Sequence, residues 1–227
     1  MNIRVVFVVF LIFAFALGTG IWSYQSLQGL NLNQAYDAGN IEIVQNTTAG
    51  TVPHQVTIKN NRADSVKIKV GDTLKSPQTQ DLVIAEDKII NPNTTSNIQA
   101  YCIEPAQRAV VGDKLIPSNN SSSRIIQIIK ESNIQNPEEA LKAQIRIWVL
   151  VSGDNLNIYR AEPYAVVQTQ GLTFTEMRNN VSEAKIEVMT KFNMTSEQLN
   201  NFNLNDTDQS QSWIDGIIIW IRTNIGI

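Results

Sequence analysis

The chain has 227 residues, of which 43% are hydrophobic and 17% are charged, a balance typical of globular rather than disordered proteins. The formal net charge is −3 and the longest basic cluster is Lys67-Ile68-Lys69, so we expect no nucleic-acid partner, because phosphate-binding surfaces concentrate Lys and Arg. A single cysteine cannot close an internal disulfide, and a single histidine, His54, gives little material for a metal site or a Ser-His-Asp triad. We expect no cofactor.

Residues 5–22 form one apolar run behind Arg4, and the next charged side chain is Asp37. A run of this length fits a transmembrane helix, and its basic start and apolar core also fit a secretory signal. We therefore predict a signal anchor or a cleaved signal peptide over residues 1–22. The expected location is the cell membrane, contacted through residues 5–22 with an extracellular C-terminal domain, or the secreted fraction.

Residues 23–40 are polar and lack a clear period, which predicts a tether. From residue 41 to residue 117 apolar and polar residues alternate in short runs such as 65–70, with turn residues between them. This pattern indicates short antiparallel strands, and we predict a β-sandwich domain of immunoglobulin-like type over 41–117. His54 follows a proline in one of the turns, where we expect a solvated side chain.

The chain changes character after residue 117. Residues 118–123 read as a polar linker, and 124–130 as a helix or a strand, with Ser123 as a helix N-cap favouring the helix. Asn136 followed by Pro137 predicts the start of an amphipathic helix that Gly153 ends. We expect 118–227 to be mostly helical with one or two short strands, near residues 158–167. The expected fold class is thus α+β, with an N-terminal membrane or signal helix.

Two further helix starts are predicted near the C-terminus. Thr173-x-x-Glu176 and Thr195-x-x-Gln198 both have the pattern of a capping box. Residues 212–225 are apolar almost all round and too short to span a bilayer, which favours a buried helix or a contact surface.

Asparagine followed by any residue and then Ser or Thr occurs seven times, at Asn46, Asn93, Asn119, Asn120, Asn180, Asn193 and Asn205. In an exported chain these positions are candidate glycosylation sites, which would make it a glycoprotein. The alternative is an asparagine-rich composition without glycans.

Three short motifs carry a resemblance to a known family. Residues 101–103 (Tyr-Cys-Ile) resemble the aromatic-Cys-hydrophobic motif of the surface thioester domains of bacterial adhesins. Residues 143–148 resemble the middle motif of that family, although Ala143 replaces its Thr and Arg146 its Ala. Residues 167–168 (Val-Gln) resemble the final hydrophobic-Gln motif.

The resemblance implies a thioester between Cys102 and Gln168, with Gln144 supporting the site. The residues alone favour a simpler interpretation for Cys102, which shares a strand face with Ile98 and Ala100 and is expected to be a small buried hydrophobe.

These patterns contain no catalytic constellation, and we expect a non-enzymatic, exported protein that acts in binding or in cell-envelope structure. Its partner is then a protein or a surface ligand. The alternative is a thioester-containing surface adhesin that forms a covalent bond to an amine through Cys102 and Gln168. A hydrolase is a third possibility, and it requires a cleft with paired carboxylates.

Overall fold

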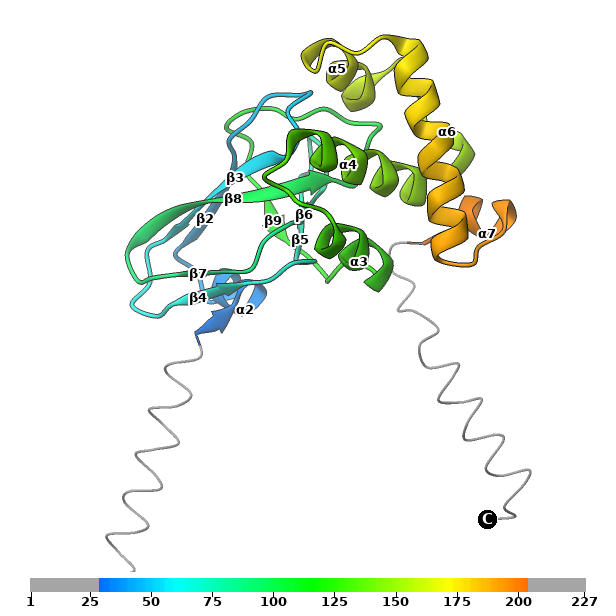
Figure 1. The fold of residues 1–227 in the computed structure, drawn as a ribbon. Coiled ribbons are helices and arrows are strands. Elements are labelled where there is room, and N and C mark those ends of the chain that lie inside the picture. Colours follow the sequence, from blue (N-terminus) through cyan, green and yellow to red (C-terminus); the bar gives the residue numbers. More distant parts are fainter. Residues whose placement is uncertain (1–28, 204–227) are drawn as a thin grey trace, which may run out of the picture.

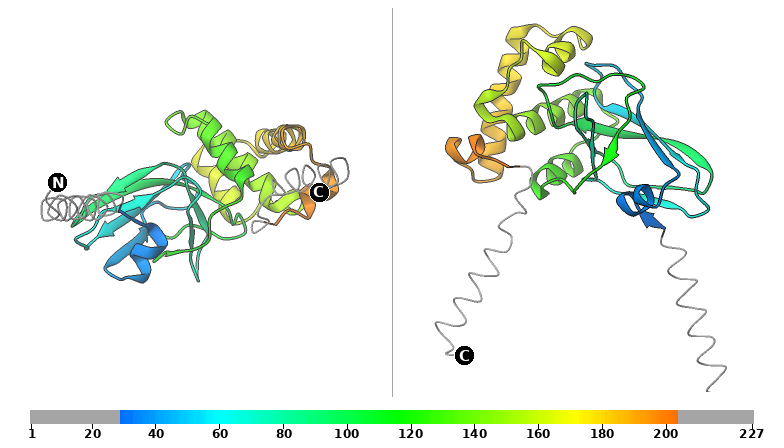
Figure 2. Two further views of the ribbon diagram at one scale, coloured as in Figure 1. Left: turned by 90° about the horizontal axis from the view of Figure 1, so that it is seen from below. Right: turned by 180° about the vertical axis from the view of Figure 1, so that it is seen from behind.

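The computed structural model describes residues 29–203. In Figure 1 the strands occupy one side of the molecule and the helices α3 to α7 the other, and the described chain begins and ends on its lower side. The same division is seen from below and from behind (Figure 2). Buried apolar side chains from both parts form one hydrophobic core.

A six-stranded antiparallel sheet forms the larger part of the strand region. Its strand order is β2-β3-β8-β6-β5-β9. The strands are β2 (Ile41–Gln45), β3 (His54–Asn60), β8 (Thr94–Cys102), β6 (Leu82–Ile84), β5 (Thr73–Lys75) and β9 (Ile116–Pro117). In β3 the side chains alternate between buried and more exposed, as expected for a strand with one face on a core.

The two edges of this sheet approach each other. The segment before β9 returns to β2, where Val44 forms a bridge with Lys114. The Leu115 N–H donates to the Ile43 carbonyl at 2.9 Å, and the Gln45 N–H donates to the Asp113 carbonyl at 2.9 Å. These bonds use donors and acceptors that an open edge would leave unpaired, so the sheet is close to a barrel.

A smaller sheet covers one end of the strand region. It has the order β1-β4-β7, with β1 (Leu30–Asn31) parallel to β4 (Val66–Ile68) and β7 (Lys88–Ile90) antiparallel to it. Asn31 begins the short helix α2 (Leu32–Asp37) with a capping box, and Leu32 and Ala35 are buried. Part of the expected tether over 23–40 therefore lies within the fold.

The helices are α3 (Ser123–Glu131), α4 (Pro137–Ser152), α5 (Ala161–Thr169), α6 (Phe174–Lys191) and α7 (Ser196–Asn200), with a 3₁₀ turn, η1, at Gly153–Asn155. The predicted caps Asn136, Thr173 and Thr195 are confirmed, because each side chain accepts a hydrogen bond from the first turn of its helix. The cap of α3 is Ser122 rather than Ser123. Residues 161–169, where we expected a short strand, form α5, since an apolar run this short does not reveal its period.

The predicted fold class is wrong. The chain is a near-barrel antiparallel sheet with helices packed beside it, and not an immunoglobulin-like sandwich followed by helices, because 112–115 joins one edge of the sheet to the other. The expected membrane or signal helix over 1–22 and the apolar segment 212–225 lie outside the described residues. Within residues 29–203 none of the helices has the length and apolar character needed to cross a bilayer, so no transmembrane helix belongs to the described fold.

Candidate binding surface around helix α5

Cys102 ends strand β8 and is completely buried. Its backbone N–H donates to Gln144 Oε1 at 2.9 Å, and Gln144 Nε2 donates to the Cys102 carbonyl at 2.8 Å. Burial raises the pKa of the Cys102 thiol well above its ordinary value, with the Trp148 side chain as the largest opposing influence. The thiolate is the reactive form of cysteine, so the raised pKa makes the Cys102 thiol unreactive. Cys102 is therefore a packed core residue. Gln144 joins helix α4 to the sheet.

Gln168, the other half of the expected thioester, lies on α5 with its side chain exposed. Cys102 remains a free thiol with no exposed surface. Of the candidate glycosylation positions, Asn180 is half-buried and Asn205 lies outside residues 29–203; the others are exposed at Asn46, Asn93, Asn119, Asn120 and Asn193.

A buried contact between a histidine and a glutamate fixes the start of α5 against the sheet. His54 at the start of β3 has no exposed surface, contrary to the expected solvated side chain, and its Nε2 lies 3.2 Å from Glu162 Oε1. Glu162 also accepts the backbone N–H of Gly50 at 2.6 Å and that of Ala109 at 3.1 Å. One carboxylate thus connects α5 to two loops and a strand.

The other ring nitrogen of His54 completes this network. His54 Nδ1 lies 3.1 Å from Thr47 Oγ1 and 3.3 Å from Gln45 Nε2. Both groups can donate, so Nδ1 accepts and the proton sits on Nε2, facing Glu162. Gln80 Nε2 lies 2.9 Å from His54 Nε2, so two donors would face each other. If the Gln80 amide is turned over, its oxygen, which has no partner among the described residues, accepts the His54 Nε2–H.

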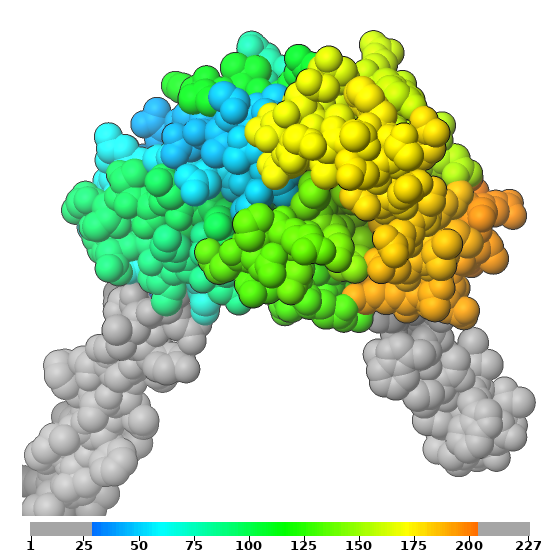
Figure 3. Space-filling view, turned by 45° about the horizontal axis from the view of Figure 1, so that its top comes forward, coloured from blue at the N-terminus to red at the C-terminus, as the bar shows by residue number. Residues whose placement is uncertain are grey.

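Helix α5 also approaches the loop after β2 closely. Gly50 has a φ of +84°, and a Cβ at this position would lie 2.4 Å from Thr169 Oγ1 and 2.5 Å from the Ala165 carbonyl oxygen. Gln170 Nε2 donates to the Gly50 carbonyl at 3.3 Å. Figure 3 shows the result, with the helices drawn in yellow lying directly against the blue segment. A side chain at residue 50 would push α5 away.

Two exposed tyrosine rings, one in the turn before α5 and one on α5, gather around a half-buried phenylalanine at the start of α6, with an arginine beside each tyrosine. The rings of Tyr159 and Phe174 lie 4.9 Å apart, and Tyr164 lies 6.0 Å from Phe174. Arg108 lies over the Tyr164 ring at 5.9 Å, and Arg178 donates to the Tyr159 hydroxyl at 2.8 Å. Tyr159 is 53% exposed and Tyr164 37%. We call these five residues the aromatic–arginine surface.

Beside this surface is a cleft of about 350 Å³ that includes Arg160, Ala161 and Pro105. Arg160 is exposed, and Arg108 Nε donates to the Ala161 carbonyl at 3.3 Å, which connects the cleft to the surface. Ala161 has a φ of +49°, a conformation that L-residues other than Asn and Asp rarely adopt and that clusters at functional positions. The cleft extends the cationic character of this end of the molecule.

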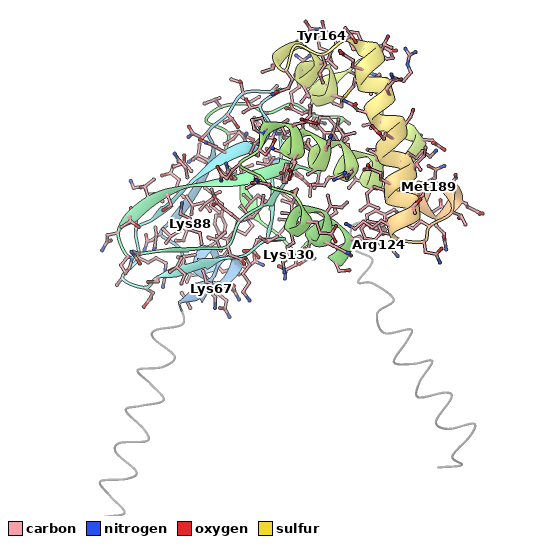
Figure 4. The ribbon with its side chains drawn as sticks, in the orientation of Figure 1. Lys67, Lys88, Arg124, Lys130, Tyr164 and Met189 are labelled. Atoms are coloured by element: carbon pink, nitrogen blue, oxygen red, sulfur yellow. The ribbon has the colours of Figure 1, made fainter. Side chains whose placement is uncertain are left out.

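The location of the aromatic–arginine surface leaves it accessible. Tyr164 projects from α5 at the far end of the molecule from Lys67, which lies on the side where the described chain begins and ends (Figure 4). Within residues 29–203 no group of three or more His, Cys, Asp or Glu side chains is arranged to hold a metal ion.

A family model, described as the ARG and Rhodanese-Phosphatase-superfamily-associated Protein domain (ARPP-1), matches residues 7–218. The chain belongs to the ARPP-1 family. No curated protein and no solved structure shows a detectable match to it.

Membership of ARPP-1 overturns the resemblance to adhesin thioester domains, which rested on three motifs of two to six residues. The description of the chain as a transmembrane surface glycoprotein with a β-sandwich is corrected with it, since the ARPP-1 match covers most of the chain and the described fold is a near-barrel with helices. Neither the aromatic–arginine surface nor Glu162 was among the residues that the sequence pointed to. The sequence carried no local signal for this surface, because its residues come together only when α5 and α6 fold.

Proposed function

We propose that this ARPP-1 chain is a non-enzymatic binding protein, and that the aromatic–arginine surface binds an acidic segment of a partner protein. The observation that carries the proposal is the contiguous array of exposed Tyr159, Tyr164, Arg108 and Arg178 around the half-buried Phe174. Tyr and Arg are enriched among the residues that dominate the energy of protein interfaces. A guanidinium matches the geometry of a carboxylate, and this favours an acidic partner.

The interior chemistry supports binding over catalysis. Cys102 is buried with a raised thiol pKa, and His54 and Glu162 are buried and bonded to each other and to neighbouring groups. Groups that act on a substrate must contact it. In this fold the same groups hold α5, and therefore the aromatic–arginine surface, in place.

The family description indicates the class of partner. It names association with proteins of the rhodanese-phosphatase superfamily. We propose a protein of that superfamily with an acidic surface segment as the partner of this chain.

Calorimetric titration of the purified full chain with a purified rhodanese-phosphatase superfamily protein from the same organism tests the proposal. We expect saturable binding that weakens as salt rises, because exposed charge pairs are screened. Tyr164→Ala and Arg178→Glu are each expected to weaken binding by about tenfold or more. The matched control is Ile186→Ala on α6, a residue that is 68% exposed and outside the aromatic–arginine surface, and it should bind as the unchanged chain does.

Two results would refute the proposal. One is the absence of binding for every superfamily member of that organism at about 100 µM, a concentration at which even a weak interface of this type is populated. The other is binding that Tyr164→Ala and Arg178→Glu leave unchanged.

A further inference from the structure

A second cleft lies on another side of the molecule, between β5, the segment that precedes α3, and the end of α7. Its volume is about 460 Å³, within the range of small-molecule sites, and Lys75, Asp81, Asn120, Ser121 and Phe202 are among the residues that line it. Figure 2, right, shows α7 and α3 close together on this side. The aromatic–arginine surface shares none of its lining residues.

The charges in this cleft nearly cancel. Lys75 supplies one positive charge and Asp81 one negative charge, and the two attract each other. Burial raises the pKa of Asp81. The pKa of nearby Glu104, which does not line the cleft, is raised mainly by burial and next by the charge of Asp81. A phosphate would therefore meet a carboxylate as well as an ammonium group, so the cleft favours a ligand without net charge.

Most of the other polar groups in the cleft can both donate and accept hydrogen bonds. Asn119 and Asn120 are exposed there, and neither side chain forms a hydrogen bond to residues 29–203. Ser121 is only 9% exposed, and its hydroxyl is buried with no hydrogen-bond partner in the described chain. Buried polar groups are nearly always paired, so the unpaired Ser121 hydroxyl indicates a missing partner such as a bound water beside the cleft.

Apolar groups share the cleft with these amides and hydroxyls. Phe202, Ile103 and Val151 contribute to its wall. A sugar ring has the same two kinds of surface: hydroxyls that donate and accept, and C–H faces that pack on apolar side chains. A neutral sugar therefore fits a cleft that combines amides, hydroxyls and an aromatic ring.

We propose that the cleft between β5, the segment before α3 and α7 binds a neutral sugar, with Asp81, Asn119 and Asn120 bonding its hydroxyls and Phe202 contacting its ring. This site is separate from the aromatic–arginine surface, so it stands or falls independently of the partner protein.

Saturation-transfer NMR on the full chain tests this proposal, with D-glucose, N-acetyl-D-glucosamine and D-ribose as probes and inorganic phosphate as the ionic comparison. We expect at least one of the sugars to bind with a dissociation constant in the millimolar range or tighter, and phosphate not to compete. Asn120→Ala and Asp81→Asn should each weaken that binding by about fivefold to tenfold, the effect of one lost hydrogen bond. Asn180→Ala, in a different groove between α4 and α6, is the control and should leave it unchanged, as should Tyr164→Ala.

The proposal is overturned if none of the three sugars binds at about 20 mM, a concentration that populates even millimolar sites. It is also overturned if phosphate binds in their place, or if Asn120→Ala and Asp81→Asn, shown to be folded by their amide spectra, bind as tightly as the unchanged chain.

Discussion

Replacing Glu162 by alanine is the sharpest test of how helix α5 is held. The carboxylate accepts hydrogen bonds from the buried N–H groups of Gly50 and Ala109 and pairs with His54, and its side chain has no exposed surface. Its removal leaves these donors without a partner in a region that excludes water.

The magnitude follows from counting the groups left unpaired. Each buried N–H without a partner costs about 1–3 kcal/mol, and removal of the Glu162 side chain leaves three of them, on Gly50, Ala109 and His54. These contributions overlap, because the three donors share one carboxylate, so we expect Glu162→Ala to lower the free energy of unfolding by about 4 kcal/mol. Glu162→Gln, which keeps one acceptor oxygen, should lose about half as much.

Urea denaturation monitored by circular dichroism measures both variants. Glu187→Ala is the control, since Glu187 is exposed and pairs with Arg146 at 2.6 Å, and exposed ion pairs contribute about 0–1 kcal/mol. The reasoning is refuted if Glu162→Ala costs no more than Glu187→Ala does.

Three other substitutions give direct readouts. Gly50→Ala should lower the free energy of unfolding in urea by about 2–4 kcal/mol, because the new Cβ would overlap the α5 backbone. Gly39→Ala is the control, at a similar φ of +82° but with no atom within 4 Å, and should cost only about 1 kcal/mol. Equal costs for the two would contradict the argument from close approach. Gln144→Leu removes both hydrogen bonds to the β8 backbone and should lower the free energy of unfolding by about 2–5 kcal/mol. Gln168→Leu, at an exposed position, should change it by about 0.5 kcal/mol or less. Similar losses for the two would argue that the Gln144 amide does not stabilise the fold. Burial raises the pKa of Asp81, so the folded chain holds this proton more tightly than the unfolded chain and loses stability as the pH rises from about 3.8 through the raised value. Asp81→Asn should remove that loss and flatten the dependence of unfolding free energy on pH, and an unchanged slope in denaturation at pH 4 to 7 would show that Asp81 is not the group responsible.

The local elements were predictable from sequence, since they depend on neighbouring residues. Asn136 and Pro137 predicted the start of α4, and two capping boxes predicted α6 and α7. The alternation over 65–70 predicted β4. Each of these signals lies within a few residues of the structure that it forms.

The arrangement of the strands was not predictable in the same way. Alternation shows that a segment is a strand but not which strand pairs with it, so the closure of β2 by residues 112–115 has no local signal. The predicted β-sandwich therefore rested on an analogy with domains of similar strand spacing, and it is wrong. Helix α5 was missed because Val166 and Val167 are adjacent buried residues in a short element, a pattern equally consistent with a strand.

The candidate sites were even less predictable, because they depend on residues that lie far apart in the sequence. His54 was expected to be solvated in a turn because its partner Glu162 lies far along the chain, and a long-range pair leaves no trace in one sequence. The expected burial of Cys102 as a small hydrophobe was confirmed, since Ile98 and Ala100 on the same strand face already indicated it. The aromatic–arginine surface depends on the fold of α5, and it could not be assembled before that helix was known.

The position of Cys102 gives experimenters an internal reporter. It is the only thiol in the chain, and it is sealed between β8 and α4. A sulfhydryl reagent can modify it only when these two elements separate, so the rate of labelling under native conditions measures how often β8 and α4 separate, without an engineered cysteine. A ligand bound elsewhere that tightens the fold would slow the reaction.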